Sequence, residues 1–218
     1  MRKNGRPSIG SGLIFPLSEE KIMIDPLYLE DHWPRIAAID FGWDHPTAVV
    51  WCAMDTEEEM FYVYDCYRAS KASPAVHSEV IRGRPHFIPI VYPHDGNRRD
   101  SMGNPGLADQ YRNLGCNFLL EHFTNPPALG NNKGSNSVEE GIMALLQAME
   151  KGKFKVFSTL GDWFEEFRMY HRKQNKVVPF RDDLMSATRY AFQSQRHSVA
   201  GKDPTWTQDV EYRNYGII

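Results

Sequence analysis

The sequence has few cysteines and no long apolar run. Its three cysteines, Cys52, Cys66 and Cys116, are scattered without a CxxC spacing. This scarcity argues against a disulfide framework and against a zinc site, and it suits a reducing cytosol. No apolar run approaches the roughly 20 residues needed to span a membrane, and the basic start lacks the apolar core of a signal peptide. We therefore expect no membrane partner.

The chain also lacks an excess of basic residues. It carries 25 Lys and Arg against 28 Asp and Glu, a formal net charge of −3. A dedicated nucleic-acid binder usually has a basic excess, so the balance argues weakly against that class. A local basic face can still coexist with an acidic remainder. The length of 218 residues, of which 41% are apolar, is enough for one well-cored domain.

The hydrophobic pattern divides the chain into three parts. Residues 1–34 hold Gly, Pro and Ser with little periodicity, and we interpret them as a linker or lead-in segment, consistent with excision from a longer protein. Residues 35–196 show regular patterning and form the predicted domain. Residues 197–218 have little apolar periodicity, and we expect this tail to be poorly ordered.

Three strands open the predicted domain. Residues 35–41, 47–54 and 60–68 are rich in small apolar, β-branched and aromatic residues, and they are joined by short polar turns. Short connections are typical of antiparallel neighbours, so these strands predict a meander.

Strands and helices alternate after the meander. We expect strands over residues 86–95, 117–123 and 153–158, and helices over residues 73–83, 105–115, 137–152, 160–173 and 181–196. The alternation predicts an α/β fold in which parallel strands follow the meander in a mixed central sheet with helices on both faces.

Carboxylates stand at three predicted element ends. Asp40 ends the first strand, Asp95 ends the strand over 86–95, and Asp182 with Asp183 opens the last helix. Parallel strands would bring their carboxyl ends to one edge of the sheet, where α/β proteins place ligand sites. Converging carboxylates need a counter-charge. Hard oxygen ligands favour Mg²⁺ or Mn²⁺, and such sites serve phosphoryl transfer with two ions.

Each acid also has a simpler explanation. An aspartate at a strand end often caps a turn, Asp95 could form an Asx turn, and acids in a first helical turn complement the helix dipole. The ordered set favours a metal site. Asp183 lies one turn before Ala187 on the apolar stripe of the last helix, so it should face the sheet edge, and Asp182 is the alternative.

Several neighbours are candidate accessory groups. Asp44 and His45 share the turn after the first strand, where they either order the turn or contact the site. Basic residues that could hold DNA phosphates are Arg98, Arg99, Arg172 and Lys173, although charge clusters are usually solvated faces.

With these residues in place, the chain resembles the C-terminal nuclease domain of the large terminase subunit of tailed bacteriophages. The shared segments are IAAIDFGWDHPTAVV, IVYPHDG and RDDLMSATRYA, in that order, after the lead-in GSGLIFP, and they span most of residues 10–195. The resemblance implies an RNase H-like fold, related to resolvases and integrases. It also implies an endonuclease that cuts concatemeric double-stranded viral DNA during genome packaging.

The resemblance further implies a site and partners. The family's three metal-binding acids match Asp40, Asp95 and an acid of the Asp182–Asp183 pair, for which we choose Asp183, and they hold two Mg²⁺ or Mn²⁺ ions. Many members have Asp-Ala where this chain has Ser186–Ala187, so Asp182 stays the alternative. Expected partners are double-stranded DNA, an ATPase motor domain, the small terminase subunit and the portal protein, in the cytoplasm of the infected bacterial host. No GxxxxGK[ST] phosphate loop occurs here, so the chain resembles the nuclease half alone.

Two other functions compete with a nuclease. The segment IDFGWDHPTAVV also resembles the first phosphate-binding hairpin of actin-like ATPases and sugar kinases, but those proteins need a second Gly-rich hairpin, and PHDGNRRD does not supply it. The other alternative is a non-catalytic docking domain with a degenerate acidic site, which predicts no metal binding.

Overall fold

The structure is a computed structural model that describes residues 12–98, 105–127, 134–174 and 176–201. Its strands are β1 (Met23–Ile24), β2 (Arg35–Asp40), β3 (Thr47–Asp55), β4 (Met60–Ala69), β5 (Ile90–Val91), β6 (Phe154–Phe157), β7 (Arg172–Lys173) and β8 (Lys176–Val177). Its helices are α1 (Pro74–Arg82), α2 (Leu107–Asn113), α3 (Val138–Glu150), α4 (Gly161–Met169) and α5 (Asp183–Gln193), with 3-10 turns η1 (Glu19–Lys21), η2 (His94–Asn97) and η3 (Gln195–His197). Within these ranges, no helix has the length and apolar content needed to cross a membrane.

Six strands form one mixed sheet in the order β1-β6-β4-β3-β2-β5, and β7 and β8 form a separate two-stranded sheet. β2, β3 and β4 are antiparallel neighbours, whereas β5 pairs in parallel with β2, and β6 pairs in parallel with β4 and β1. The β3–β4 turn is closed by Asp55, whose Oδ1 accepts the amide N–H groups of Glu57 and Glu58 at 3.0 and 3.1 Å. The predicted meander and mixed α/β sheet are confirmed.

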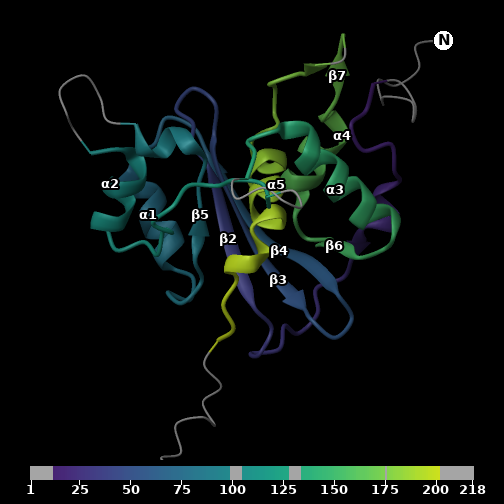
Figure 1. Cartoon of the computed structure of the whole chain (residues 1–218), viewed down its shortest axis with the longest axis horizontal. Coiled ribbons are helices and arrows are strands. Elements are labelled where there is room, and N and C mark those ends of the chain that lie inside the picture. The colour runs from purple at the N-terminus through teal and green to yellow at the C-terminus, as the bar shows by residue number, and fades with distance from the viewer. Residues whose placement is uncertain (1–11, 99–104, 128–133, 175, 202–218) are drawn as a thin grey trace, which may run out of the picture.

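Helices cover both faces of the sheet, as predicted. Figure 1 shows α1 and α2 gathered beside β5, α3 and α4 gathered at the β6 end, and α5 crossing the middle strands. Side chains of β2 contribute to the cores on both faces of the sheet, because successive residues of a strand point to opposite faces. Ile36 and Ala38 are fully buried on the face covered by α5, and Ala37 and Ile39 are fully buried on the other.

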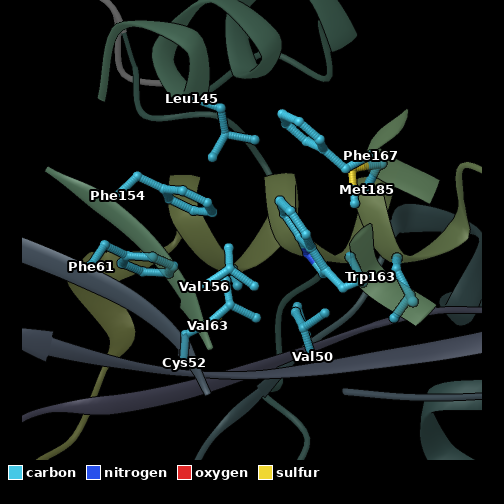
Figure 2. Packing of buried hydrophobic residues seen from close by; sticks show 14 of the residues in the cluster. Val50, Cys52, Phe61, Val63, Leu145, Phe154, Val156, Trp163, Phe167 and Met185 are labelled. Atoms are coloured by element: carbon cyan, nitrogen blue, oxygen red, sulfur yellow. The ribbon is translucent and has the colours of Figure 1, made fainter. Parts of the chain in front are cut away.

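The larger core lies between the sheet and helices α3, α4 and α5. Figure 2 shows Val50 and Val63 pointing from the sheet toward Trp163 of α4. The ring of Trp163 stacks on Phe167 with centroids 5.3 Å apart, and its Nε1–H donates to Thr188 Oγ1 of α5 at 2.9 Å. The hydrogen bond offsets the cost of removing the indole N–H from water, so it stabilises the contact between α4 and α5.

The smaller core lies under α1 and α2 and is mostly aromatic. Tyr111 stacks on Phe118 with centroids 5.0 Å apart, and Phe41 packs on Tyr111 at 5.7 Å. Tyr92 is fully buried in the same cluster. A few large rings thus fill the space between the sheet and these two short helices.

The segment ahead of β2 packs on the larger core. Ile14, Phe15 and Ile22 are buried there, and β1 extends the sheet beside β6. At the other end of the chain, Arg35 of β2 and Val199 exchange two backbone hydrogen bonds of 2.8 and 3.0 Å. The rest of the predicted tail, from residue 202 on, lies outside the described residues.

The predicted strand over residues 86–95 is wrong for most of its length, since only Ile90–Val91 pairs in the sheet. Pro89 and Pro93 flank this short piece and have no amide N–H to donate to a ladder. After Pro93 the chain turns at once into η2, so Asp95 stands on a 3-10 turn rather than on a strand.

The predicted strand over residues 117–123 is also wrong. Phe118 forms a single bridge to Ile90, and none of residues 117–123 belongs to a named strand. The Leu119 N–H donates to Ile90 O at 3.0 Å, but the carbonyl groups of Leu119 and Leu120 accept from Arg112 rather than from a neighbouring strand. These carbonyl groups are therefore not available to continue a sheet ladder.

Two predicted helices are shorter than expected. Helix α4 ends at Met169 rather than at residue 173, because the chain then pairs with residues 12–14: the amides of Arg172 and Ile14 donate to Gly12 and Tyr170 carbonyls at 2.6 and 3.0 Å. Helix α5 begins at Asp183 rather than at residue 181 and ends at Gln193. Both boundaries are set by tertiary contacts that local pattern does not encode.

Candidate metal centre

Asp40 is the last residue of β2. It follows Ile36 and Ala38 on the same face of the strand, so it points toward α5. The hydroxyl of Tyr190 in α5 donates to Asp40 Oδ1 over 3.5 Å, at the limit of a hydrogen bond. Asp40 is therefore a carboxylate at the rim of the larger core, with a helix packed against it.

Asp183 is the first residue of α5, and its exposed fraction is only 8%. The apolar stripe behind it, Leu184, Ala187 and Ala191, is fully buried against the sheet. The stripe places Asp183 at the sheet end of the helix, as the spacing predicts. Asp182 takes the N-cap position, yet its side chain makes no capping hydrogen bond.

Asp95 lies on η2 and is exposed. Its neighbours fix the turn tightly. A Cβ on Gly96 would lie 2.6 Å from Phe41 and 2.7 Å from Tyr92, so only glycine fits there. The Tyr92 hydroxyl donates to Asn97 Oδ1 at 2.9 Å and receives a hydrogen bond from Arg112 at 2.9 Å. The smaller core thereby determines where the third acid stands.

The carboxylates act on one another electrostatically. Burial, and then repulsion from Asp183, Asp95 and Asp182 in that order, raises the pKa of Asp40 from 3.8 to about 8, and Arg189 opposes the rise. Burial also raises the pKa of Asp183 and of Asp182. Repulsion of this kind requires the acids to lie near one another, as the sequence predicts. Asp183 acts on Asp40 more strongly than Asp182 does.

The acids do not form a closed ligand cage. Among the residues that the structure describes, no group of three His, Cys, Asp or Glu side chains is drawn together closely enough to hold a metal ion. The pair of Asp40 and Asp183 belongs to the larger core, and Asp95 reaches the same end of the sheet from the smaller core. The acids therefore share one end of the sheet without sharing a ready-made coordination shell.

Arg189 of α5 is a cation that the sequence analysis missed. It is 4% exposed, and its guanidinium lies 4.6 Å from the Tyr190 ring centroid and 5.6 Å from that of Phe123. A Cβ on Gly141 of α3 would lie 2.5 Å from the Arg189 Cγ, so a glycine makes room for the side chain. Its charge opposes the rise in the pKa of Asp40. Arg189 lies about half a turn around α5 from Ala187 and Ala191, on the side that packs against Gly141 of α3, so the apolar stripe of α5 gave no signal for it.

The turn after β2 supplies the accessory groups. Asp44 and His45 are exposed and line a groove that also includes Arg68, Phe180 and Asp183. The charge of His45 opposes the rise in the pKa of Asp183, which places the imidazole near that carboxylate.

The predicted basic residues do not form one surface. Arg98 is exposed beside η2, and Lys173 is exposed on β7. Arg172 is already paired with Glu139 of α3 through two hydrogen bonds of 2.5 and 2.6 Å. Arg99 lies outside the described residues.

Glu166 of α4 is a second residue that the sequence analysis missed. Its side chain is fully buried, and its carboxylate contacts Arg68 of β4 and the first turn of α5. The available signal was its spacing, since Glu166 lies three residues after Trp163 and four before Tyr170, on the apolar face of the helix.

Residues 37–195 of the chain match the model of the terminase RNaseH-like domain. The chain belongs to this family. This terminase domain is 37% identical over 203 residues to the large terminase subunit of Salmonella phage P22, covering 93% of the chain and 40% of the P22 protein. It is 38% identical over 192 residues to the large terminase subunit of Enterobacteria phage LP7, covering 88% of the chain and 39% of that protein. The terminase domain thus spans about 40% of the length of these relatives.

Solved structures confirm the RNase H-like fold of the terminase domain. The nuclease domain of the P22 large terminase superposes with a TM-score of 0.78 at 37% identity, covering 88% of this chain and 97% of that one. The nuclease domain of the bacteriophage SPP1 large terminase superposes at 0.54 with 18% identity, covering 79% of this chain and 94% of that one, which shows a shared fold. The recognition of a terminase nuclease domain, rather than of an actin-like ATPase, is confirmed.

Proposed function

We propose that this chain is a metal-dependent endonuclease that cuts concatemeric double-stranded viral DNA during genome packaging. One observation carries the proposal: the carboxylate of Asp40 ends β2 at the rim of the larger core near Asp183, Asp95 and Asp182, and burial, followed by repulsion from these acids, raises its pKa to about 8. A protein gains nothing in stability from gathering acids around a partly buried carboxylate. Such an arrangement suits a cationic partner that offsets the repulsion, and family membership supports nuclease chemistry at this place.

Asp40, Asp95 and Asp183 would hold the metal. Their oxygen atoms suit a hard cation, and the free cysteines in the described part of the chain lie elsewhere, so Mg²⁺ or Mn²⁺ fits better than a thiolate-bound metal. The SPP1 nuclease domain was solved with bound Mn. Two divalent ions, when bound, would activate the attacking water and stabilise the leaving oxygen of the phosphodiester. The order of repulsions on Asp40 supports Asp183 over Asp182 as the third ligand.

The surrounding residues orient the acids and meet the DNA. Tyr190 contacts Asp40, and Arg189 lowers the electrostatic cost of the cluster. We propose Asp44 and His45 as accessory groups, since both line the groove beside Asp183. Arg98, Arg99, Arg172 and Lys173 are the proposed DNA contacts, and binding through so few cations should be weak and strongly salt-dependent.

The rest of the terminase system is proposed from the family to which the chain belongs. We propose that residues 35–196 act as the nuclease domain, with residues 1–34 as a lead-in from an ATPase motor domain and residues 197–218 as a tail. The matched relatives are more than twice as long as this chain, which leaves room for such a motor. The small terminase subunit and the portal protein are the remaining proposed partners, in the cytoplasm of the infected bacterial host.

The test is nicking of supercoiled plasmid DNA in the presence of Mn²⁺ by the wild type, Asp40→Asn, Asp183→Ala and Asp182→Ala. We expect the wild type to nick many unrelated sequences and to stop when the metal is chelated. Asp40→Asn and Asp183→Ala should lose the activity, because each removes a proposed ligand. Asp182→Ala should keep most of it and serves as the matched control.

Three results would contradict parts of the proposal. Nicking that survives exhaustive chelation would show that the activity needs no divalent metal ion. Loss of activity in Asp182→Ala alone would show that Asp182, rather than Asp183, is the third ligand. A wild type that neither binds Mn²⁺ nor nicks DNA would indicate a docking domain with a degenerate acidic site.

A further inference from the structure

Helix α4 holds the start of α5 through a buried carboxylate. The side chain of Glu166 is fully buried, and its Oε2 accepts the amide N–H of Leu184 at 2.7 Å. Leu184 directly follows Asp183 in the first turn of α5, where amide groups have no partner within the helix. A local N-cap normally satisfies such groups, but the side chain of Asp182 does not. Glu166 supplies the missing acceptor from another helix.

Arg68 at the end of β4 balances this buried charge. Its Nη1 donates to Glu166 Oε1 at 3.0 Å, and its Nη2 donates to Asp162 at 3.0 Å and to Glu165 at 2.5 Å. The Arg68 side chain is 18% exposed, so the pair with Glu166 is largely shielded from water. An unpaired carboxylate at such a site would be strongly destabilising. Burial raises the pKa of Glu166 to about 7, and the bonds from Arg68 and Leu184 oppose that rise.

The neighbouring residue of α4 fixes the chain just before α5. Glu165 pairs with Arg181, and Arg181 has a φ of 51°, a left-handed backbone that residues other than glycine seldom adopt. Two adjacent glutamates of α4 therefore hold the chain on both sides of Asp182 and Asp183. These two contacts explain why Asp183 is held at a fixed place although the residues before it lie in a loop.

We propose that Glu166, with Arg68 as its counter-ion, is a positioning residue for Asp183 in the metal centre, an inference that rests on the proposed function. In this assignment Glu166 contacts neither the DNA nor the reacting atoms, and Arg68, which lines the groove beside Asp183, acts as its counter-ion. Glu166 fixes the direction of the first turn of α5, and this direction decides whether the Asp183 carboxylate faces Asp40. Groups that orient metal ligands without touching the metal commonly change metal affinity or activity by about 10–100-fold.

Glu166→Gln is the decisive variant. Glutamine keeps the shape and an acceptor oxygen, but it loses the charge that strengthens the bonds to Arg68 and Leu184. We expect Mn²⁺ affinity, measured by electron paramagnetic resonance of the free ion, to fall at least about tenfold. The kcat for plasmid nicking should fall by a similar factor while KM for DNA stays unchanged, because no DNA contact is removed.

Asp162→Asn is the matched control. It removes the same charge from the same helix and also loses a bond to Arg68. Asp162 is 60% exposed, however, and its only ion pair among the described residues is with Arg68, so it does not hold α5. Its Mn²⁺ affinity and kcat should equal those of the wild type. An equal loss in both variants would assign the effect to net charge and overturn the inference.

The remaining outcomes separate the two proposals. A folded Glu166→Gln with wild-type Mn²⁺ affinity and kcat overturns the positioning role alone. A wild type that binds no Mn²⁺ overturns the proposed function and the inference with it. If Glu166→Gln fails to fold, Arg68→Lys decides: it keeps the charge but not the forked geometry, so weaker Mn²⁺ binding at an unchanged melting temperature supports the role, and wild-type binding overturns it.

Discussion

The two faces of the sheet are built in different ways, and each delivers part of the candidate site. The larger face is closed by α3, α4 and α5, and it carries Asp40 and Asp183 at its rim. The smaller face is closed by the short helices α1 and α2 over a group of aromatic rings. It delivers Asp95 on a 3-10 turn that is exposed to solvent.

The difference concerns how each acid is held in place. Asp183 is attached to a long buried helix whose first turn is bonded to α4, so moving it would disturb the larger core. Asp95 depends on a close fit at Gly96 and on the hydrogen bonds of Tyr92 with Asn97 and Arg112. We infer that loss of apolar packing in the larger face mainly lowers stability, whereas small shifts of the 3-10 turn on the smaller face mainly alter activity.

The largest expected effect is loss of the central side chain of the larger core. Trp163→Ala should lower the free energy of unfolding by about 3–5 kcal/mol, because it leaves a cavity and removes the hydrogen bond that Thr188 Oγ1 accepts from the indole. Urea denaturation followed by circular dichroism measures the change. A loss below about 1 kcal/mol would show that the larger face does not dominate stability.

The next effect separates activity from stability on the smaller face. Gly96→Ala would place a Cβ 2.6 Å from Phe41 and 2.7 Å from Tyr92, so η2 must shift. We expect a stability cost of about 1–3 kcal/mol from overpacking. Plasmid nicking should slow by up to about 100-fold, because Asp95 moves with the turn.

Gly161→Ala is the control for this prediction. A Cβ at Gly161 meets no atom within 4 Å, so this variant should nick DNA at the wild-type rate. Equal nicking by Gly96→Ala and the wild type would show that η2 does not position a functional acid.

Removing the electrostatic repulsion at Asp40 should stabilise the protein without metal. The pKa of Asp40 is about 8 in the folded state and 3.8 ordinarily, so the folded protein binds more protons between these values. Wild-type stability should therefore fall as pH rises from about 4 to about 8. Asp40→Asn should remove this part of the slope and raise the stability of the metal-free protein at pH 8 above that of the wild type.

Thermal melting in a chelating buffer across this pH range tests the prediction. A variant whose melting temperature follows the same pH slope as the wild type would show that Asp40 is not the group responsible.

The smallest expected effect lies at the periphery of the larger face. Glu139→Gln weakens the double hydrogen bond to Arg172, but the Glu139 side chain is 56% exposed. Exposed ion pairs contribute about 0–1 kcal/mol, so urea denaturation should show little change. A loss above about 2 kcal/mol would mean that surface contacts, rather than the depth of packing, stabilise this face.

The sequence by itself determined the meander and the order of the elements, and it led to the terminase family, whereas its choice of acids stays a prediction. Alternating and continuous apolar runs with short polar turns specify β2, β3 and β4, because local pattern and short connections are enough to pair antiparallel strands. The stripe of Leu184, Ala187 and Ala191 likewise predicted which face of α5 packs on the sheet, and these residues are fully buried. These features are local, so they can be recognised without knowing the rest of the chain.

Only the tertiary structure decided how the site is supported. The 3-10 turn that carries Asp95, the room that Gly141 leaves for Arg189, and the bond from Glu166 to α5 all join residues far apart in the sequence. Glu166 and Leu184 are 18 residues apart, and Arg68 and Glu166 are 98 apart. Whether a buried charge stabilises or destabilises the protein depends on which partner the fold brings beside it. No local sequence pattern contains that information.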